Sequence, residues 1–286
     1  MDPPPPNENH PNCYNFVTWF NKNNTYHLSV TESDDLTPAH FQEPFILCVG
    51  SPCHFRSNHS YFTASVSNNI QLHDSYEILL YMKQYLVKEK MEIIHVKTQT
   101  LTKSKWNYNK LLDYFIETER KQIFNQVSLE ISNYPNLAAE ITSPGFVQKI
   151  DWIDLAWKNE FPLPYFQQIR KYYPRIQKYI VSSVKYSYLD FHFDMSGASV
   201  WFYLITGKKI LCLIEPTNNV LLRYERWCFE NKNGSFIEII KHVAKPIFVT
   251  ACAGDTIIIP AGYFHAKYTV EDSVVAAEIF FSYLCF

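Results

Sequence analysis

A chain of 286 residues is long enough to bury a sizeable core and to form one large domain or two small ones. Its formal net charge of −2 provides no basic field of the kind that proteins use to bind nucleic acid directly. No apolar run reaches the roughly 18 residues that a membrane-spanning helix needs, so no membrane association is expected. The seven cysteines are odd in number and contain no Cys-x-x-Cys pair, which favours free thiols in a reducing, intracellular compartment.

The first part of the chain predicts a mixture of helices and strands. Residues 1–12 are rich in proline and asparagine and are predicted to be disordered. Residues 13–70 alternate short apolar runs with polar breaks, which predicts short strands and loops. Apolar residues then recur at helical spacing over residues 75–90. The further elements predicted here are strands at 91–96 and 122–131 and helices at 105–117 and 151–157.

From Lys185 onward the pattern changes to one strand after another. Strands are predicted at 186–193, 198–205, 209–214, 247–251, 255–259, 263–269 and 274–281, with a turn at 206–208 and a helix at 218–228. No linker or repeat divides the chain. We therefore predict a fold that is mainly β with some α. A double-stranded β-helix (jelly-roll) over 121–286 is expected to carry an α/β N-terminal part over 13–120, packed on its barrel.

One short motif carries chemistry. His192 and Asp194 lie two residues apart on a predicted strand, so their side chains point to the same side. His265 lies in a later strand, after the Pro260–Gly262 turn, and a barrel can bring the two strands together. His-x-Asp followed by a distant His is the form of the triad that binds non-haem Fe(II) and leaves positions open for a co-substrate and O₂. The alternative is a surface pair, or a pair satisfied within the core.

Four ordered stretches decide between these alternatives. They resemble the JmjC lysine demethylases, nearest to the subgroup that carries F-box or PHD-finger modules elsewhere in the chain. The stretches are Tyr188-Leu-Asp-Phe-His-Phe-Asp-Met-Ser-Gly197 with its continuation to Thr217, then 124–132, 149–155 and 254–266. The resemblance implies a JmjC/cupin-like β-helix. It also implies an enzyme that uses Fe(II), 2-oxoglutarate and O₂, with Fe(II) on His192, Asp194 and His265.

The resemblance also implies residues that bind the co-substrate. Lys209 matches the lysine that pairs with the far carboxylate of 2-oxoglutarate, and Asn125 matches a position near the same molecule. An alternative for Lys209 is a surface lysine in a hairpin turn, beside Lys208. An alternative for Asn125 is a polar cap at the end of a strand.

Three positions depart from the family pattern. Leu189 and Phe202 stand where the subgroup has a threonine and a tyrosine whose hydroxyls reach oxoglutarate, and Ala276-Ala-Glu-Ile279 stands in place of a Gly-Gly-Asn stretch. Each lost hydrogen bond to a charged group costs on the order of 1.5–3 kcal/mol. Tyr203 or Thr206 is a candidate to replace the lost contacts.

The implied function is demethylation of methyl-lysine, foremost on the tail of histone H3 in the nucleus, with release of succinate, CO₂ and formaldehyde. A protein hydroxylase of the same chemistry is one alternative. Another is a weak or inactive JmjC fold that binds chromatin or proteins, which the residues Leu189, Phe202 and Ile279 favour. No PHD finger, F-box or zinc module is recognisable, so we expect either a catalytic fragment or a short family member.

Overall fold

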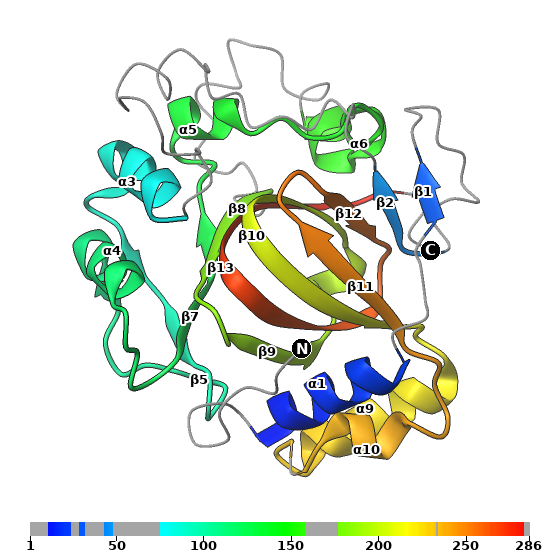
Figure 1. The fold of residues 1–286 in the computed structure, drawn as a ribbon. Coiled ribbons are helices and arrows are strands. Elements are labelled where there is room, and N and C mark those ends of the chain that lie inside the picture. The colour runs from blue at the N-terminus through cyan, green and yellow to red at the C-terminus, as the bar shows by residue number, and fades with distance from the viewer. Residues whose placement is uncertain are drawn as a thin grey trace.

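Two long strands at the centre of the molecule, β10 (Ser199–Ile214) and β13 (Phe264–Phe280), pair antiparallel from end to end (Figure 1). They belong to a computed structural model that describes residues 11–23, 29–31, 43–47, 75–157, 177–232 and 234–282. Both strands are rich in β-branched and aromatic residues, which fit a pleated and largely buried surface. The pair forms a ribbon whose two faces both pack against apolar side chains.

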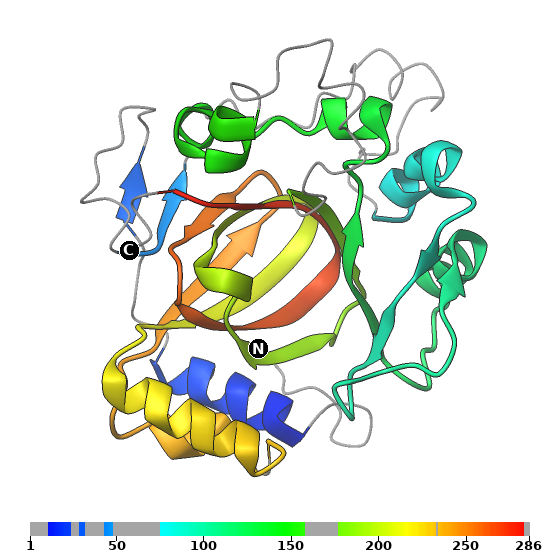
Figure 2. The same ribbon diagram turned by 180° about the vertical axis from the view of Figure 1, so that it is seen from behind.

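Four shorter strands close this ribbon into a barrel. Along β10 the partners are β12 (Thr256–Ile259) and then β11 (Ile247–Cys252). Along β13 they are β9 (Tyr188–His192) and then β8 (Lys178–Ser183). All these pairings are antiparallel, and Figures 1 and 2 show the barrel from its two sides. The predicted fold class, a double-stranded β-helix, is confirmed.

The sheet continues beyond the barrel on both sides. Next to β8 follow β7 (Phe124–Glu130), β4 (Ile93–His95) and β5 (Thr100–Leu101). Next to β12 follow β2 (Phe45–Leu47) and β1 (Ser29–Thr31). A separate two-stranded ladder joins β3 (Lys90–Met91) and β6 (Trp106–Asn107). The boundary predicted near residue 120 stays a prediction, and β4 and β5, which precede it, share a sheet with the barrel.

Helices surround the barrel (Figure 1). They are α1 (Pro11–Asn23), α3 (Ser75–Leu86), α4 (Tyr108–Ile116), α5 (Pro135–Glu140), α6 (Gly145–Ile150), α9 (Asn218–Phe229) and α10 (Phe236–Ile240), with a π-helical turn η2 (Ile153–Trp157) and a 3₁₀ turn η4 (Met195–Gly197). In both views α1, α9 and α10 lie together below the barrel, and α3 and α4 flank β7. Within the described ranges, no helix has the length and apolar character that spanning a membrane requires.

Side chains of the barrel strands alternate between two apolar cores. The interior core lies inside the barrel, where Leu211 of β10 meets Val249 of β11 and Val275 of β13. The outer core lies between the barrel and the helices, and includes Trp201 of β10 and Phe16 of α1. Because each strand contributes to both cores, the parity of a residue decides whether it faces the inside of the barrel.

Several predicted elements are confirmed with changed ends. The helix predicted at 218–228 is α9, and Thr217 caps it by accepting a hydrogen bond from the Val220 amide at 3.4 Å. The helix predicted at 105–117 begins later as α4, because Asn107 caps it and accepts from the Lys110 amide at 2.8 Å. The helix predicted at 75–90 is α3, which ends at Leu86.

The prediction for the N-terminal residues is wrong from residue 11 to residue 23. These residues form α1 rather than a disordered start followed by short strands, and residues 1–10 lie outside the described residues. Cys13, Phe16, Val17 and Phe20 are buried on one face of this helix. Their spacing is the helical one (i, i+3, i+4, i+7), so the signal was present in the sequence.

The strands predicted at 198–205 and 209–214 are one strand, β10, and those at 263–269 and 274–281 are one strand, β13. The predicted turn at 206–208 is instead an irregular stretch where the register with β13 shifts between Leu204 and Lys209. Bulges of this kind bend a strand without ending its ladder, so the ribbon can curve into a barrel. Strand β8, which closes the barrel, was not predicted.

Gly207 makes this irregular stretch possible. Its backbone has φ +83, and a Cβ there would lie 2.1 Å from the carbonyl oxygen of Asp272 on β13. Only a residue without a side chain allows both the left-handed backbone and this close approach of the two strands.

We therefore expect Gly207→Ala to destabilise the protein strongly. Gly254→Ala is the matched control, because Gly254 also has a positive φ (+97) but no atom within 4 Å of an added Cβ. Both changes strain the backbone, whereas only Gly207→Ala adds overpacking, worth about 1–3 kcal/mol. Urea unfolding of both variants checks this difference. Equal losses in the free energy of unfolding would show that the close approach at Gly207 is unimportant.

Candidate metal centre

The two histidines meet because β9 pairs with the start of β13. His192 ends β9 directly opposite His265 on β13, and their ring centroids lie 4.2 Å apart. Asp194 follows in extended conformation (φ −70, ψ 154), just before the turn η4, and its Oδ2 lies 3.9 Å from Nε2 of His265. One potential ligand atom from each of the three side chains lies within 4.8 Å of the others. The structure thus brings together the three residues that the motif predicted.

Both imidazoles are oriented by backbone carbonyl groups. Nδ1 of His192 donates to the carbonyl of Asp190 at 2.8 Å, and Nδ1 of His265 donates to the carbonyl of Tyr263 at 3.3 Å. A carbonyl oxygen only accepts, so each Nδ1 carries the proton and each Nε2 keeps its lone pair. Nε2 of His265 is buried without a hydrogen-bond partner among the described residues. A divalent cation would satisfy this atom, and the donor set fits non-haem Fe(II).

The electrostatic surroundings keep both imidazoles neutral. Burial lowers the pKa of His265 well below its ordinary value, and the proximity of His192 and Lys267 lowers it further. Burial also lowers the pKa of His192, and the charge on Lys267 acts in the same direction, whereas Asp194 opposes it. Neutral imidazole is the form that binds a metal ion, so the site needs no deprotonation step at neutral pH.

Lys209 lies inside the barrel rather than on a hairpin surface. It stands opposite Thr269 in the β10–β13 ladder, is 3% exposed, and donates from Nζ to Oγ1 of Thr269 at 2.8 Å. His265 stands opposite Leu213 in the same ladder, so Lys209, Leu213 and His265 face the same side. Burial, reinforced by the charge on Lys267, lowers the pKa of the Lys209 ammonium to about 7.

Asn125 is also buried, on strand β7 beside the barrel. It stands opposite Ser183 of β8, whose hydroxyl donates to Oδ1 of Asn125 at 2.7 Å. Ser183 has the same parity as Val181, which packs against the interior core. The amide group of Asn125 therefore faces the side of the sheet that carries Lys209.

Tyr203 does not join these residues. It packs against the outer core with Trp201, on the face of β10 opposite to that of Phe202. Thr206 is also engaged elsewhere, since its hydroxyl lies 2.7 Å from that of Ser75 and accepts from the Val274 amide at 3.1 Å. Neither position supports the prediction that Tyr203 or Thr206 replaces the lost hydroxyls near the co-substrate, which stays a prediction.

One residue of this interior surface was missed from the sequence. Lys267 lies two residues after His265 on β13, and its Nζ lies 5.3 Å from the ring centroid of Phe202. In the ladder with β9 it stands opposite Leu189. The signal was the i, i+2 spacing from a predicted ligand, the same spacing that pairs His192 with Asp194.

Comparison with known proteins identifies the family. No family model matches the chain. The JmjC domain-containing histone demethylation protein 1 of Aspergillus fumigatus is 33% identical over 201 residues, which cover 70% of this chain and 14% of the relative. The protein of the same name from Kluyveromyces lactis is 31% identical over 222 residues, which cover 75% of this chain and 45% of the relative. The chain belongs to the JmjC-domain family.

A third JmjC relative agrees with this. The lysine-specific demethylase phf2 of Danio rerio is 34% identical over 182 residues, which cover 64% of this chain and 16% of the relative. The JmjC chain therefore spans less than half the length of each of these three relatives.

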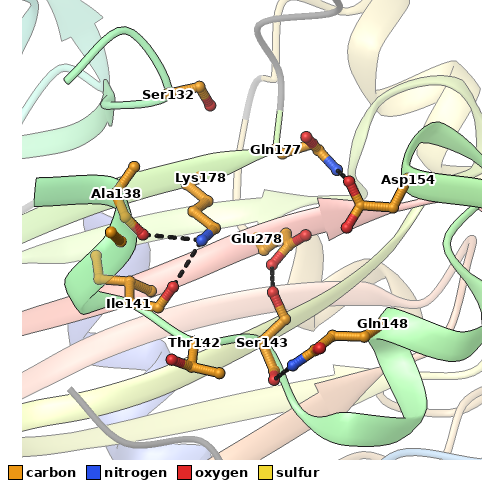
Figure 3. Close-up of a pocket in the computed structure, with 11 residues that line it drawn as sticks. Ser132, Ala138, Ile141, Thr142, Ser143, Gln148, Asp154, Gln177, Lys178 and Glu278 are labelled. Atoms are coloured by element: carbon orange, nitrogen blue, oxygen red, sulfur yellow. Dashed lines mark hydrogen bonds between the residues drawn. The ribbon is translucent and has the colours of Figure 1, made fainter. Parts of the chain in front are cut away.

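A hollow of about 370 Å³, with no triad residue in its lining, lies between strands β8 and β13 and the segment that joins α5 to α6 (Figure 3). Its polar floor is Glu278, which is 2% exposed and accepts hydrogen bonds from Ser143 and from the Trp201 indole at 3.2 Å. Lys178 lies beside it and donates to the carbonyls of Ala138 and Ile141 at 2.9 and 2.6 Å. Burial raises the pKa of Glu278 from 4.5 to about 7.

This raised pKa predicts a pH-dependent contribution to stability. Between pH 4.5 and 7 the folded chain keeps a proton on Glu278 that the unfolded chain releases, so the free energy of unfolding falls as pH rises. The slope is at most about 1.4 kcal/mol per pH unit. Glutamine has no proton to release, so we expect Glu278→Gln to remove this fall in the free energy of unfolding. Compared with the unchanged protein, the variant should therefore be favoured more at pH 8 than at pH 5.

Urea unfolding at the two pH values, with a chelator present, measures the effect. Glu271→Gln, at an exposed position of the same strand, is the control. If both variants showed the pH dependence of the unchanged protein, the proton would not reside on Glu278.

Proposed function

We propose that this chain is an Fe(II)- and 2-oxoglutarate-dependent dioxygenase that removes methyl groups from lysine, with the tail of histone H3 as its substrate and the nucleus as its place of action. The observation that carries this proposal is the convergence of His192, Asp194 and His265, with both Nε2 atoms left available. The names of the relatives, which are histone and lysine demethylases, support the substrate class.

Each interior residue has a role in this proposal. His192, Asp194 and His265 hold the metal, whose chemistry when bound is the activation of O₂: one oxygen atom enters succinate, and the other enters the methyl carbon that leaves as formaldehyde. The carbonyls of Asp190 and Tyr263 orient the two imidazoles.

Lys209 and Asn125 are assigned to the co-substrate. The Lys209 ammonium forms an ion pair with the far carboxylate of 2-oxoglutarate in a setting where water is largely absent, since its side chain is 3% exposed. Asn125 fixes the position of the same molecule through its amide. The interior core around them, which includes Leu211 and Leu213, excludes water from the reaction.

The decisive experiment measures products. The protein is incubated with Fe(II), 2-oxoglutarate, O₂ and methylated H3 peptides, and succinate, formaldehyde and peptide mass are followed. The expected result is formaldehyde in equal amount to succinate. The peptide should lose about 14 Da, one CH₂ unit, for each turnover. Succinate with a gain of one oxygen and no formaldehyde would instead indicate a hydroxylase. Metal binding without any product would indicate a binding module, which the apolar residues Leu189 and Phe202 favour.

The metal assignment predicts the effect of removing each ligand. His192→Ala, Asp194→Ala and His265→Ala should each weaken Mn(II) binding, used as a redox-stable probe, by at least about 100-fold, because two remaining ligands hold a divalent ion poorly. Isothermal titration measures this, with His242→Ala at an exposed position as the control. Full metal affinity in any one of the three variants would remove that residue from the triad.

The co-substrate assignment predicts a contrast between neighbouring lysines. Lys209→Ala should weaken 2-oxoglutarate binding about 10- to 100-fold, because a buried ion pair is lost. Lys208→Ala should have little effect, since Lys208 is partly exposed and its neighbour faces the interior. The dissociation constants are measured with Mn(II) present and O₂ excluded. A larger effect at Lys208 would overturn this assignment.

A further inference from the structure

We propose that Lys267 is a second cationic residue of the co-substrate site, and that it receives the far carboxylate of 2-oxoglutarate together with Lys209. This inference rests on the proposed function and names a residue to which the sequence motifs assigned no role.

The position of Lys267 on β13 places it between the metal triad and Lys209. His265, Lys267 and Thr269 alternate along one strand and therefore point to the same side. In the ladder with β10, Lys267 stands opposite Leu211, and Leu211 packs in the interior core. On this surface Lys267 therefore lies between His265 and the Thr269–Lys209 pair.

Lys267 is close to both ends of this surface. His265 lies two residues before it on β13, and Thr269, the hydrogen-bond partner of Lys209, lies two residues after it. A strand rises by about 3.3 Å per residue, so each end is about 7 Å along the strand from Lys267. A molecule that bridges the metal and Lys209 therefore passes within Coulombic range of Lys267.

Lys267 forms no salt bridge within the described part of the chain. Its Nζ contacts the Phe202 ring, and no carboxylate of the described residues lies within 4.0 Å of it. Among the described residues, the face that carries the triad has two lysines, Lys209 and Lys267, beside the carboxylate of Asp194. Like charges in a buried site repel each other, so an anionic ligand between them relieves an unfavourable interaction.

The two contacts of Lys267 coincide with the positions that depart from the family pattern. Its neighbour across the ladder is Leu189 and its ring contact is Phe202, where the resemblance implied two hydroxyls directed at oxoglutarate. An ammonium at this place supplies a charge-assisted hydrogen bond where two neutral donors are missing. The exchange keeps a hydrogen-bond donor at this place and adds a basic group.

A competing role for Lys267 is that of a built-in cation that takes the place of the metal beside Asp194. The hydrogen bonds of the described residues do not support this. None of them joins Nζ of Lys267 to Asp194 or to His192, and Nε2 of His265 remains without a partner. The ligand atoms are therefore free to receive a metal while Lys267 contacts Phe202.

The test compares the unchanged protein with Lys267→Met, which keeps the length of the side chain and removes its charge. Isothermal titration without O₂ measures binding of Mn(II), then of 2-oxoglutarate, then of 2-oxopentanoate, in which a methyl group replaces the far carboxylate. We expect the dissociation constant for 2-oxoglutarate to rise about 10- to 100-fold. Binding of 2-oxopentanoate should change less than about threefold, and Mn(II) alone should bind as tightly as before or more tightly, because a like charge has been removed.

Two further variants complete the test. Lys267→Arg keeps the charge and should retain most of the affinity for 2-oxoglutarate, whereas a purely structural defect would not be rescued by it. Lys208→Met, on the partly exposed neighbour of Lys209, controls for the general loss of one positive charge and should leave all three constants unchanged.

The outcomes separate this inference from the proposed function. If the unchanged protein binds Mn(II) and 2-oxoglutarate but Lys267→Met binds both equally well, only the role of Lys267 is overturned. The same holds if Lys267→Met binds 2-oxoglutarate more tightly, which would show that the lysine obstructs the site. If the unchanged protein binds no 2-oxoglutarate, both proposals are overturned.

Discussion

The pairing of β10 with β13 is the constraint on which the rest of the structure depends. Its register places His265 opposite Leu213 and Lys209 opposite Thr269, so a metal ligand and a buried cation face the same interior. A slip by one residue would turn every one of these side chains to the outer core. The same strand β13 carries β9 on its other edge, and this pairing brings His192 opposite His265. The site is thus built by two ladders that share one strand.

The interior of this barrel is an unusual place for so many polar groups. His265 and Lys209 are almost fully buried among apolar side chains such as Leu211 and Val249. Burial disfavours their charged forms, which is why the pKa of each falls below its ordinary value. Groups of this kind stabilise a fold poorly by themselves, and they gain partners when ligands bind. The polar interior is therefore better explained by ligand binding than by stability.

Charge, rather than hydroxyl donors, distinguishes the proposed co-substrate site of this chain. A site built on hydroxyls recognises a carboxylate through neutral hydrogen bonds, whereas Lys209 and Lys267 act through positive charge as well. The added positive charge repels a divalent cation and attracts the 2-oxoglutarate dianion. A bound dianion offsets this charge, so the binding of metal and the binding of co-substrate should reinforce each other. On this view the apolar residues Leu189 and Phe202 are not simply losses, because they lie beside the ammonium group of Lys267.

The irregular stretch of β10 explains why some predictions from the sequence are wrong. Alternation along an unbroken strand would place Tyr203 and Lys209 on the same face, because their numbers have the same parity. The register shifts between Leu204 and Lys209 reverse this parity, so Phe202 rather than Tyr203 shares the interior with Lys209. Such a bulge depends on Gly207 meeting Asp272 of another strand, which no local pattern reveals.

The sequence by itself determined the features that repeat over short distances. Alternating apolar residues predicted the β-rich fold, and the spacing of His192 and Asp194 placed two donors on one side of a strand. A histidine on a later strand, His265, completed the motif, and ordered stretches of similarity added Lys209; the structure places both residues on the interior face. Capped helices such as α9 were also predictable, because caps and periodicity are local signals.

Only the tertiary structure decided which side chains share the interior. It joined predicted pairs of strands into continuous ones, added β8 to close the barrel, and placed Tyr203 outside and Lys267 inside. These outcomes depend on pairing between residues far apart in the chain, where one bulge changes the face of every residue that follows. Local preferences carry no information about such register, so the composition of the site emerged only when β9, β10 and β13 were brought together.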